Sequence, residues 1–141
     1  MTTNRRITLA QTPTDKLAAS DFADDEIATP ELEDGQFLLD VKYVSVDPTI
    51  RGWVAYDTYL PKIAEGEVIR AGGAGEVIES RNTQYPVGTR VTGMTGWQSL
   101  AVSDGGFIIP DGVDYTDALS VFGANGLTAY VGMLNIGKPA E

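Results

Sequence analysis

Short runs of β-forming residues, each ended by glycine, proline or aspartate, most constrain how this chain can fold. The clearest run is residues 36–47, where apolar side chains alternate and both faces are partly apolar. Further strands are predicted at residues 5–10, as two pieces around a glycine bend in 67–80, as two strands in 88–103, and at 105–110. Residues 12–35 are acidic, contain prolines and show no sustained period, so we expect mostly surface loop there. Short strands at such intervals predict a mainly β domain, a small barrel or sandwich.

The C-terminal part of the chain has a different pattern. Asp114 is placed to cap a helix over residues 115–122. A second helix is predicted to begin at Asn125 or Gly126 and to run through Leu134, because apolar residues then recur at spacings of three and four. We therefore expect two short helices after the β part.

Length and composition fit one domain over residues 1–141. With 43% hydrophobic residues, a chain of this length can bury an ordinary core. It has no cysteine and no histidine, which excludes disulfides, thiolate nucleophiles, Ser-His-Asp triads and metal sites built on imidazole or thiolate. No D-x-D-x-D-G loop is present either, so no metal is predicted.

The formal net charge of −10 disfavours nucleic acid and anionic membranes as partners. No apolar run reaches the ~20 residues that span a bilayer. The N-terminus carries two arginines but no apolar segment of a signal peptide. The expected compartment is therefore the cytoplasm, and the expected partner is a small molecule.

The glycine-rich segment "RAGGAGEVIES" at residues 70–80 resembles a phosphate-binding loop at first sight. A dinucleotide loop needs G-x-G-x-x-G between a strand and a helix. The register that begins at Gly73 places Ile78 where the last glycine should be, and the residues that follow alternate like a strand. The glycines are therefore predicted to permit a bend, a bulge or close backbone approach, and the chain alone is predicted not to build a dinucleotide fold.

Four segments in order resemble one family, the zinc-independent medium-chain dehydrogenase/reductases. The segments are "VSVDPTIRG" (44–52), "GEVIRAGGAGEVIESRN" (66–82), "VGTRVTGMTGWQSLAV" (87–102) and "GANGLTAYVGMLNIGKP" (123–139). The similarity is to the N-terminal half of the branch of leukotriene B4 dehydrogenase, prostaglandin reductase and alkenal double-bond reductase. It implies a GroES-like, partly open β-barrel that serves as the substrate-side catalytic domain, with two short helices at its C-terminal end.

The resemblance also implies an activity. Such enzymes use NADPH, held mainly by a following Rossmann domain that this chain lacks, to reduce the carbon–carbon double bond of α,β-unsaturated ketones and aldehydes. The chain stops where that domain is expected to begin, so it is expected to be one domain of a longer, homodimeric oxidoreductase. The isolated 141-residue chain is predicted to be inactive.

The family motif that matches "DPTIRG" implies a substrate-pocket position at Thr49, where relatives usually have tyrosine. The tyrosine in "DTYLP", Tyr59, matches one that faces the enone, and it is the candidate catalytic residue. Tyr56 is a further pocket candidate without a clear family counterpart. For Thr49 a plain turn residue, and for Tyr59 a half-buried aromatic, remain the alternatives. Asp47 and Arg51 are expected to be structural.

The candidate cofactor residues are Asn125, Gly126 and Thr128. In the family the matching helix lies against the nicotinamide, and the residue equivalent to Thr128 approaches its edge. The alternative is a helix start capped by Asn125, with Thr128 facing solvent. For Trp97 and Gln98, packing and the satisfaction of buried backbone groups are expected rather than a ligand contact.

Two other functions stay open from the sequence. One is a quinone reductase with the same fold and zinc-free chemistry. The other is a stand-alone GroES-like binding module without enzymatic activity, against which the C-terminal segment at residues 125–139 argues, because it reads as a bridge to another domain.

Overall fold

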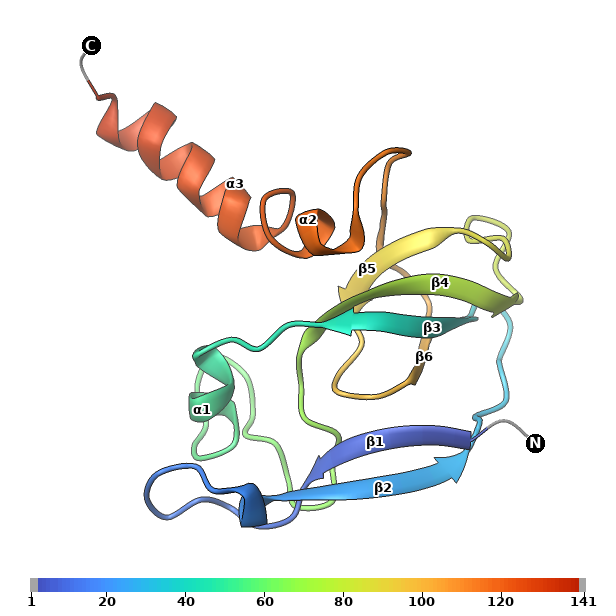
Figure 1. Cartoon of the computed structure of the whole chain (residues 1–141), viewed down its shortest axis with the longest axis vertical. Helices are drawn as coiled ribbons and strands as arrows, with labels where there is room; N and C mark the ends of the chain where they lie inside the picture. The colour runs from blue at the N-terminus through green and yellow to red at the C-terminus, as the bar shows by residue number, and fades with distance from the viewer. Residues whose placement is uncertain (1–2, 140–141) are drawn as a thin grey trace.

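The computed structural model describes residues 3–139, so the outermost residues of the predicted domain, 1–2 and 140–141, lie outside the described part of the chain. Its strands are β1 (Thr3–Leu9), β2 (Phe22–Ala28), β3 (Phe37–Val44), β4 (Gly72–Ser80), β5 (Arg90–Met94), β6 (Leu100–Ser103) and β7 (Phe107–Ile108) (Figure 1). Its helices are η1 (Ala19–Asp21), α1 (Thr49–Trp53), α2 (Tyr115–Leu119), α3 (Ala124–Tyr130) and the π-helix η2 (Val131–Gly137). The predicted mainly β class is confirmed.

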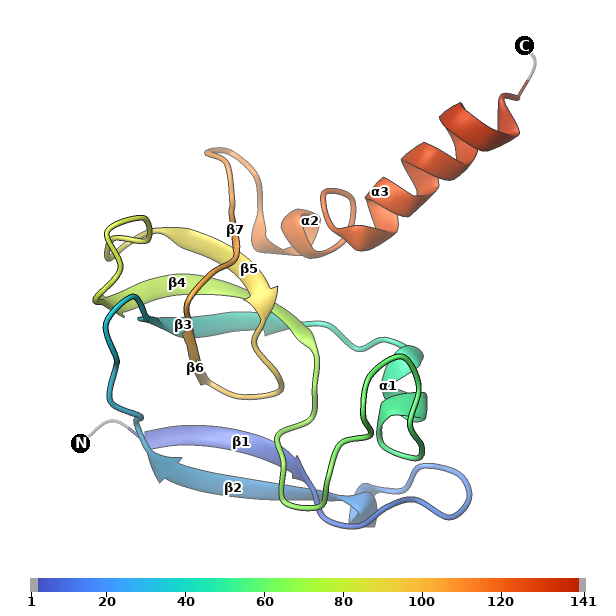
Figure 2. The same ribbon diagram turned by 180° about the vertical axis from the view of Figure 1, so that it is seen from behind.

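The strands form two open sheets that do not close into one barrel. β1 and β2 make an antiparallel pair, and the larger antiparallel sheet has the order β6-β3-β4-β5-β7. Figures 1 and 2 show the β1–β2 pair below the larger sheet. Isolated bridges from Arg6 to Gln98 and from Thr8 to Val68 connect β1 to the segments that precede β6 and β4. This is the partly open β arrangement with short C-terminal helices that the resemblance implied.

The expectation that residues 12–35 are mostly loop is wrong, because they contain β2. The strand is rich in carboxylates, which hides its period in the sequence. Arg5 and Arg6 on β1 form ion pairs with Asp24 and Asp25 on β2. Opposite charges on neighbouring strands stabilise the pairing of β1 and β2. Charged side chains also suit β2 as an edge strand, because they disfavour pairing with another chain.

The glycine-rich segment forms a single strand, β4, rather than two pieces around a bend. Gly75 lies opposite Val41, next to a register irregularity in β3. A Cβ at Gly75 would collide with the backbone of Asp40, lying 2.9 Å from its carbonyl carbon and closer still to its oxygen. The glycine therefore permits close approach of two strands, as predicted, and the segment is no phosphate-binding loop.

Where the sequence predicts only a turn, the structure has the short helix α1. Pro48 precedes it with helical backbone angles, which suits proline at a helix start. The backbone N–H of Ile50 donates to Asp47 O at 3.0 Å, and that of Arg51 donates to Pro48 O at 3.1 Å. A short helix of this kind leaves little periodicity to detect.

The C-terminal helices differ from prediction in their ends. α2 has Asp114 before its first residue, but the Asp114 side chain makes no capping hydrogen bond, and the helix ends at Leu119 rather than at residue 122. Gly123, not Asn125, precedes the first residue of α3. The helical path continues as η2 to Gly137, past the predicted end at residue 134.

Two main apolar clusters make the core. One, between β1, α1 and the segment before β4, contains Leu9, Ile50, Trp53, Val54, Ile63, Ile69 and Ala71. The other, inside the larger sheet, contains Phe37, Leu39, Val77, Val91 and Ala101. The buried Asn4 joins the two sheets: its Nδ2 donates to Gln98 Oε1 at 3.0 Å, and its Oδ1 accepts from the backbone N–H of Leu100 at 2.9 Å. Such buried polar groups fix the relative position of the sheets only while they remain paired.

Asp21, which is 4% exposed, gives the fold an expected pH dependence. A hydrogen bond from the backbone N–H of Ala18 and a second from Gln11 Nε2 hold the pKa of the Asp21 carboxyl below its usual range. A pKa lowered by folding adds stability above the unfolded-state pKa of about 3.9, and that stability is lost as the pH falls through the folded value. Asp21→Asn is therefore expected to lower the stability at neutral pH and to flatten its loss below about pH 4. Urea unfolding followed by circular dichroism at a series of pH values measures this. Parallel pH profiles for the two proteins would contradict it.

Candidate active site

The three predicted substrate-pocket residues lie on one segment, α1 and the loop after it. Thr49 is the first residue of α1 and is exposed. The same helix is fixed to the rest of the fold by Arg51, whose Nη2 donates to Asp15 O at 2.7 Å. Arg51 thus has the structural role expected for it, and Thr49 is free to meet a ligand.

The two predicted tyrosines present their rings on the surface of this segment. Tyr59 is 78% exposed and Tyr56 is 60% exposed. The Tyr59 ring meets the buried Trp53 edge-on at a centroid distance of 6.4 Å, and the guanidinium of Arg70 lies 5.6 Å from the centroid of the Trp53 ring. Tyr59 therefore stands on a fixed aromatic base, with most of its surface accessible to a ligand. This exposure goes beyond the half-buried alternative considered from the sequence.

The predicted cofactor residues lie on a different element, α3. Asn125 and Thr128 are exposed, and Thr128 Oγ1 donates to Ala124 O at 2.7 Å. Gly126 has a packing reason of its own, because a Cβ there would collide with the carbonyl of Val121. Figure 1 shows α3 directed away from α1 and from both sheets. Within residues 3–139, no hydrogen bond or ring contact joins these residues to the α1 segment, so the structure presents the predicted site as two separate surfaces.

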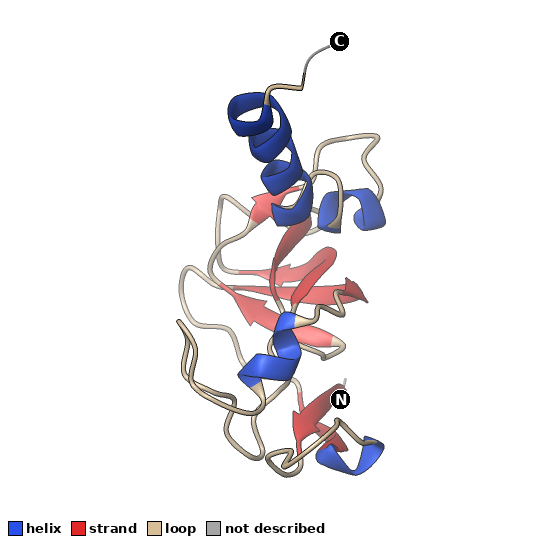
Figure 3. Ribbon diagram, turned by 90° about the vertical axis from the view of Figure 1, so that its left-hand side faces the viewer, coloured by secondary structure: helices blue, strands red, loops and turns tan. Residues whose placement is uncertain are grey.

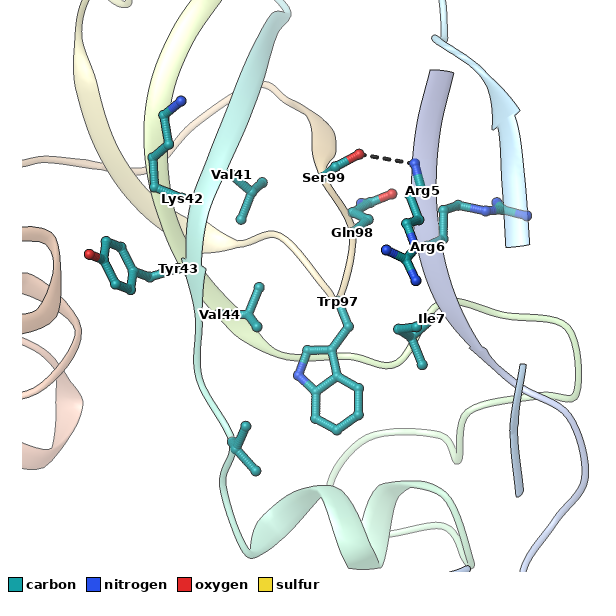
Figure 4. A pocket seen from close by; sticks show the side chains of 11 residues that line it. Arg5, Arg6, Ile7, Val41, Lys42, Tyr43, Val44, Trp97, Gln98 and Ser99 are labelled. Atoms are coloured by element: carbon teal, nitrogen blue, oxygen red, sulfur yellow. Dashed lines mark hydrogen bonds between the residues drawn. The ribbon is translucent and has the colours of Figure 1, made fainter. Parts of the chain in front are cut away.

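A groove of about 500 Å³ opens between β1, β3 and the segment before β6 (Figure 4). Its lining residues are Arg5, Arg6, Ile7, Val41, Lys42, Tyr43, Val44, Val46, Trp97, Gln98 and Ser99. None of the six predicted site residues lines it. The sequence does not reveal this groove, because three segments far apart in the chain assemble it. Of its lining residues, Trp97 and Gln98 are the ones for which the sequence predicts a role, and that role is packing.

The cations around the groove are all paired with carboxylates. The hydrogen bond from Arg5 holds the pKa of the Asp24 carboxyl below its usual range and raises the pKa of the Arg5 guanidinium. Asp40 likewise raises the pKa of the Lys42 ammonium, chiefly through a hydrogen bond. With Arg6 also paired, the groove offers an apolar floor without a free charge to bind an anion.

Trp97 and Gln98 do what the sequence predicted for them. The Trp97 Nε1 donates to Ser45 O at 3.0 Å, which fixes the indole against the end of β3. Gln98 accepts from Asn4 and donates to Thr95 O at 2.6 Å, so both ends of its amide are engaged. These two side chains therefore hold the segment before β6 in place.

Neither a metal cluster nor a membrane-spanning helix occurs in the described part of the chain. Within residues 3–139, no three histidine, cysteine, aspartate or glutamate side chains are grouped so that they could hold a metal ion. No helix over the same residues has the length and apolar character needed to cross a bilayer.

Comparison with known proteins identifies the family. The sequence model of a family described as the N-terminal domain of oxidoreductase matches residues 5–110. The chain belongs to this family. This oxidoreductase N-terminal domain is 37% identical to the NADPH-dependent curcumin reductase of Escherichia coli (strain K12), over 98% of the chain and 41% of that relative. It is 35% identical to prostaglandin reductase 1 of Rattus norvegicus, over 76% of the chain and 32% of that relative.

Solved structures agree with the sequence comparison. The crystal structure of CurA from Vibrio vulnificus superposes on 98% of the oxidoreductase N-terminal domain with a TM-score of 0.90 and 37% identity, using 42% of the CurA chain. The crystal structure of CurA in complex with NADPH gives a TM-score of 0.88 and 36% identity over 97% of the chain, again using 42% of the CurA chain. The predicted membership of the zinc-independent medium-chain reductases, with a GroES-like N-terminal domain, is confirmed. The chain spans about two fifths of the length of curcumin reductase and of CurA.

Proposed function

We propose that residues 1–141 are the substrate-side domain of a two-domain, NADPH-dependent reductase that saturates the carbon–carbon double bond of α,β-unsaturated ketones and aldehydes. The observation that carries the proposal is the 37% identity to a NADPH-dependent curcumin reductase, which extends over 98% of the chain. The fold supports it, because the predicted substrate residues occupy one accessible segment supported by the core.

The proposed role of this segment is to bind the carbonyl end of the substrate. Hydride addition to the β-carbon moves the electron pair of the double bond toward the carbonyl and leaves negative charge on its oxygen as an enolate. A proton then adds to the α-carbon. We propose that the hydroxyl of Tyr59, a residue that is mostly exposed, donates a hydrogen bond to that oxygen, where charge develops, because a donor in such a position lowers the barrier. Thr49 would line the same pocket with a shorter donor than the tyrosine of relatives.

The residues present fit one wall of a NADPH site. Bound NADPH would supply the hydride. Because the hydroxyl proton of Thr128 is given to Ala124 O, its oxygen presents lone pairs, which suit the amide N–H groups of a nicotinamide. Asn125 offers an exposed donor and acceptor beside it. The glycine-rich segment is a paired strand, so we propose that the phosphates are held mainly by the second domain.

A chimera tests the proposal directly. Residues 1–141 replace the matched N-terminal part of the E. coli curcumin reductase, and NADPH oxidation is followed with a medium-chain enal and with a benzoquinone as substrates. We expect the enal to be reduced with the higher kcat/KM. Tyr59→Phe is expected to lower kcat with the enal by about 100-fold, the size of a lost oxyanion donor.

Tyr43→Phe is the matched control, since Tyr43 is also an exposed tyrosine and packs beside Tyr115, away from the α1 segment. Its kinetic constants should stay at those of the unsubstituted chimera. A folded chimera that prefers the quinone would overturn the assigned substrate class. Equal kcat values for the two variants would remove Tyr59 from the catalytic role.

A further inference from the structure

Arg70, the second residue before β4, carries a charge that no carboxylate of the described chain neutralises. Its Nη1 donates to Pro61 O at 3.1 Å, and its guanidinium carbon lies 5.6 Å from the centroid of the Trp53 ring. Within residues 3–139 three ion pairs occur, and Arg70 takes part in none of them. Because an arginine side chain has five N–H donors, most donors of Arg70 remain available to a ligand.

The carboxylates closest to Arg70 in the chain are engaged elsewhere. Asp57, Glu65 and Glu67 each accept a hydrogen bond from a backbone N–H at 2.9 Å, so they stabilise the loop between α1 and β4. Lys62 belongs to the same loop, is exposed, and likewise has no ion pair within residues 3–139. This loop of an acidic chain, whose net charge is −10, therefore carries two cations without a counter-ion.

Arg70 lies beside the candidate substrate residues. The ring centroid of Tyr59 lies 6.4 Å from that of Trp53, so Tyr59 and Arg70 contact the same buried indole. Thr49 is the first residue of the helix α1 that carries Trp53. Figure 3, seen from the side of α1, shows this helix and the loops around it in front of the strands. An anionic group bound by Arg70 would therefore lie next to the side chain proposed to bind the substrate carbonyl.

The chemistry of Arg70 favours a carboxylate as that anionic group. Contact with the Trp53 ring restricts the guanidinium, so less side-chain entropy is lost when it binds a ligand. A guanidinium binds a carboxylate through two parallel charge-assisted hydrogen bonds. Phosphate offers the same geometry, but its second negative charge is opposed by the acidic chain. A single negative charge therefore fits this position better than a dianion does.

We propose that Arg70 binds a carboxylate of the substrate, so that the domain selects α,β-unsaturated ketones and aldehydes with a carboxylate a few bonds from the double bond. The short separation follows from the contact of Tyr59 and Arg70 with one indole. This inference rests on the proposed function, because it names the substrate class of the same site.

The chimera with the E. coli curcumin reductase tests the proposal with a pair of substrates. One is an enone acid in which three methylene groups separate the carboxylate from the β-carbon, and the other is its methyl ester. We expect the acid to have the lower KM. Arg70→Gln is expected to raise KM for the acid by about tenfold with kcat nearly unchanged, and to leave KM for the ester unchanged, because it removes a charge-assisted hydrogen bond that only the acid makes.

Two further variants separate substrate binding from loop stability. Arg70→Lys keeps the charge and should recover part of the preference for the acid. Arg81→Gln is the matched control, because Arg81 is exposed, has no ion pair within residues 3–139 and follows the last residue of β4. The nine residues of β4 place it about 30 Å from Arg70. Its loss should change KM for neither substrate.

Tryptophan fluorescence gives a reading that needs no turnover. In the 141-residue chain with Trp97→Phe, Trp53 is the remaining tryptophan. We expect the saturated form of the acid to change its emission in a saturable way, and the saturated ester to change it less. Arg70→Gln should abolish this difference.

The outcomes distinguish this proposal from the proposed function. An active chimera whose preference for the acid does not depend on Arg70 overturns the proposal and leaves the reductase function in place. An inactive chimera, together with binding of the saturated acid that depends on Arg70, removes the reductase function and supports the carboxylate site. If Arg70→Gln impaired acid and ester equally, Arg70 would only hold the loop or meet a carboxylate of the following domain. If it raised KM for NADPH instead, Arg70 would bind a cofactor phosphate. Either of these last two results overturns the proposal.

Discussion

The purified 141-residue chain is expected to give no NADPH-dependent turnover of an enal, an enone or a quinone. A reductase of this kind must hold the dinucleotide as well as the substrate. The described part of the chain offers no cradle for the pyrophosphate, because its glycine-rich segment is bonded on both sides as strand β4. The candidate nicotinamide-contacting residues on α3, Asn125 and Thr128, are exposed and would form only one wall of a nicotinamide site.

The measurement is the decrease in NADPH absorbance with each substrate, together with calorimetric titration of the chain with NADPH. The E. coli curcumin reductase, assayed in parallel, is the positive control. A rate within about tenfold of that control, or saturable NADPH binding by the chain alone, would show that it carries a nucleotide site of its own.

Replacing Gly75 with alanine is expected to destabilise the fold by about 3 kcal/mol, at the upper end of the range for an overpacked core. The added Cβ would meet the backbone of Asp40 and come within 3.0 Å of Val41 Cα. A flexible side chain could rotate away from the added Cβ, but these backbone atoms cannot. The strands β3 and β4 must therefore move apart where they pair. Urea unfolding followed by circular dichroism gives the free energy of unfolding.

Gly105→Ala is the matched control, because a Cβ at Gly105 has no neighbour within 4 Å and its backbone is not in the left-handed region. It should change the stability by no more than about 0.5 kcal/mol. If Gly75→Ala were equally mild, the close approach of β3 and β4 would have no energetic consequence.

The strands with apolar alternation could be predicted from the sequence, whereas β2 could not. Residues 36–47 predict β3, because the side chains that this strand directs into the core are apolar. In β2 three of the seven residues are acidic, and two of them, Asp24 and Asp25, form ion pairs with arginines of the neighbouring strand. The signal was present as two adjacent arginines and two adjacent aspartates, but their pairing depends on a register that only the folded chain displays.

The candidate site was predictable in part. Thr49, Tyr56 and Tyr59 are close in sequence, so one element presents all of them, and the family resemblance was enough to single out Thr49 and Tyr59. The groove beside Trp97 was not predictable, because its walls come from β1, β3 and the segment before β6. The exposure of the helical path formed by α3 and η2, residues 124–137, could not be predicted either. Its apolar spacing predicts a helix correctly but is equally typical of a helix packed on its own domain.

The two tryptophans of the chain occupy informative positions. Trp53 lies under Tyr59 and Arg70, and its indole N–H is buried without a hydrogen-bond partner among the described residues. Trp97 lines the groove and packs against the same apolar cluster that contains Trp53. Intrinsic fluorescence therefore reports on both surfaces without a label, and replacing either tryptophan by phenylalanine assigns an emission change to one of them.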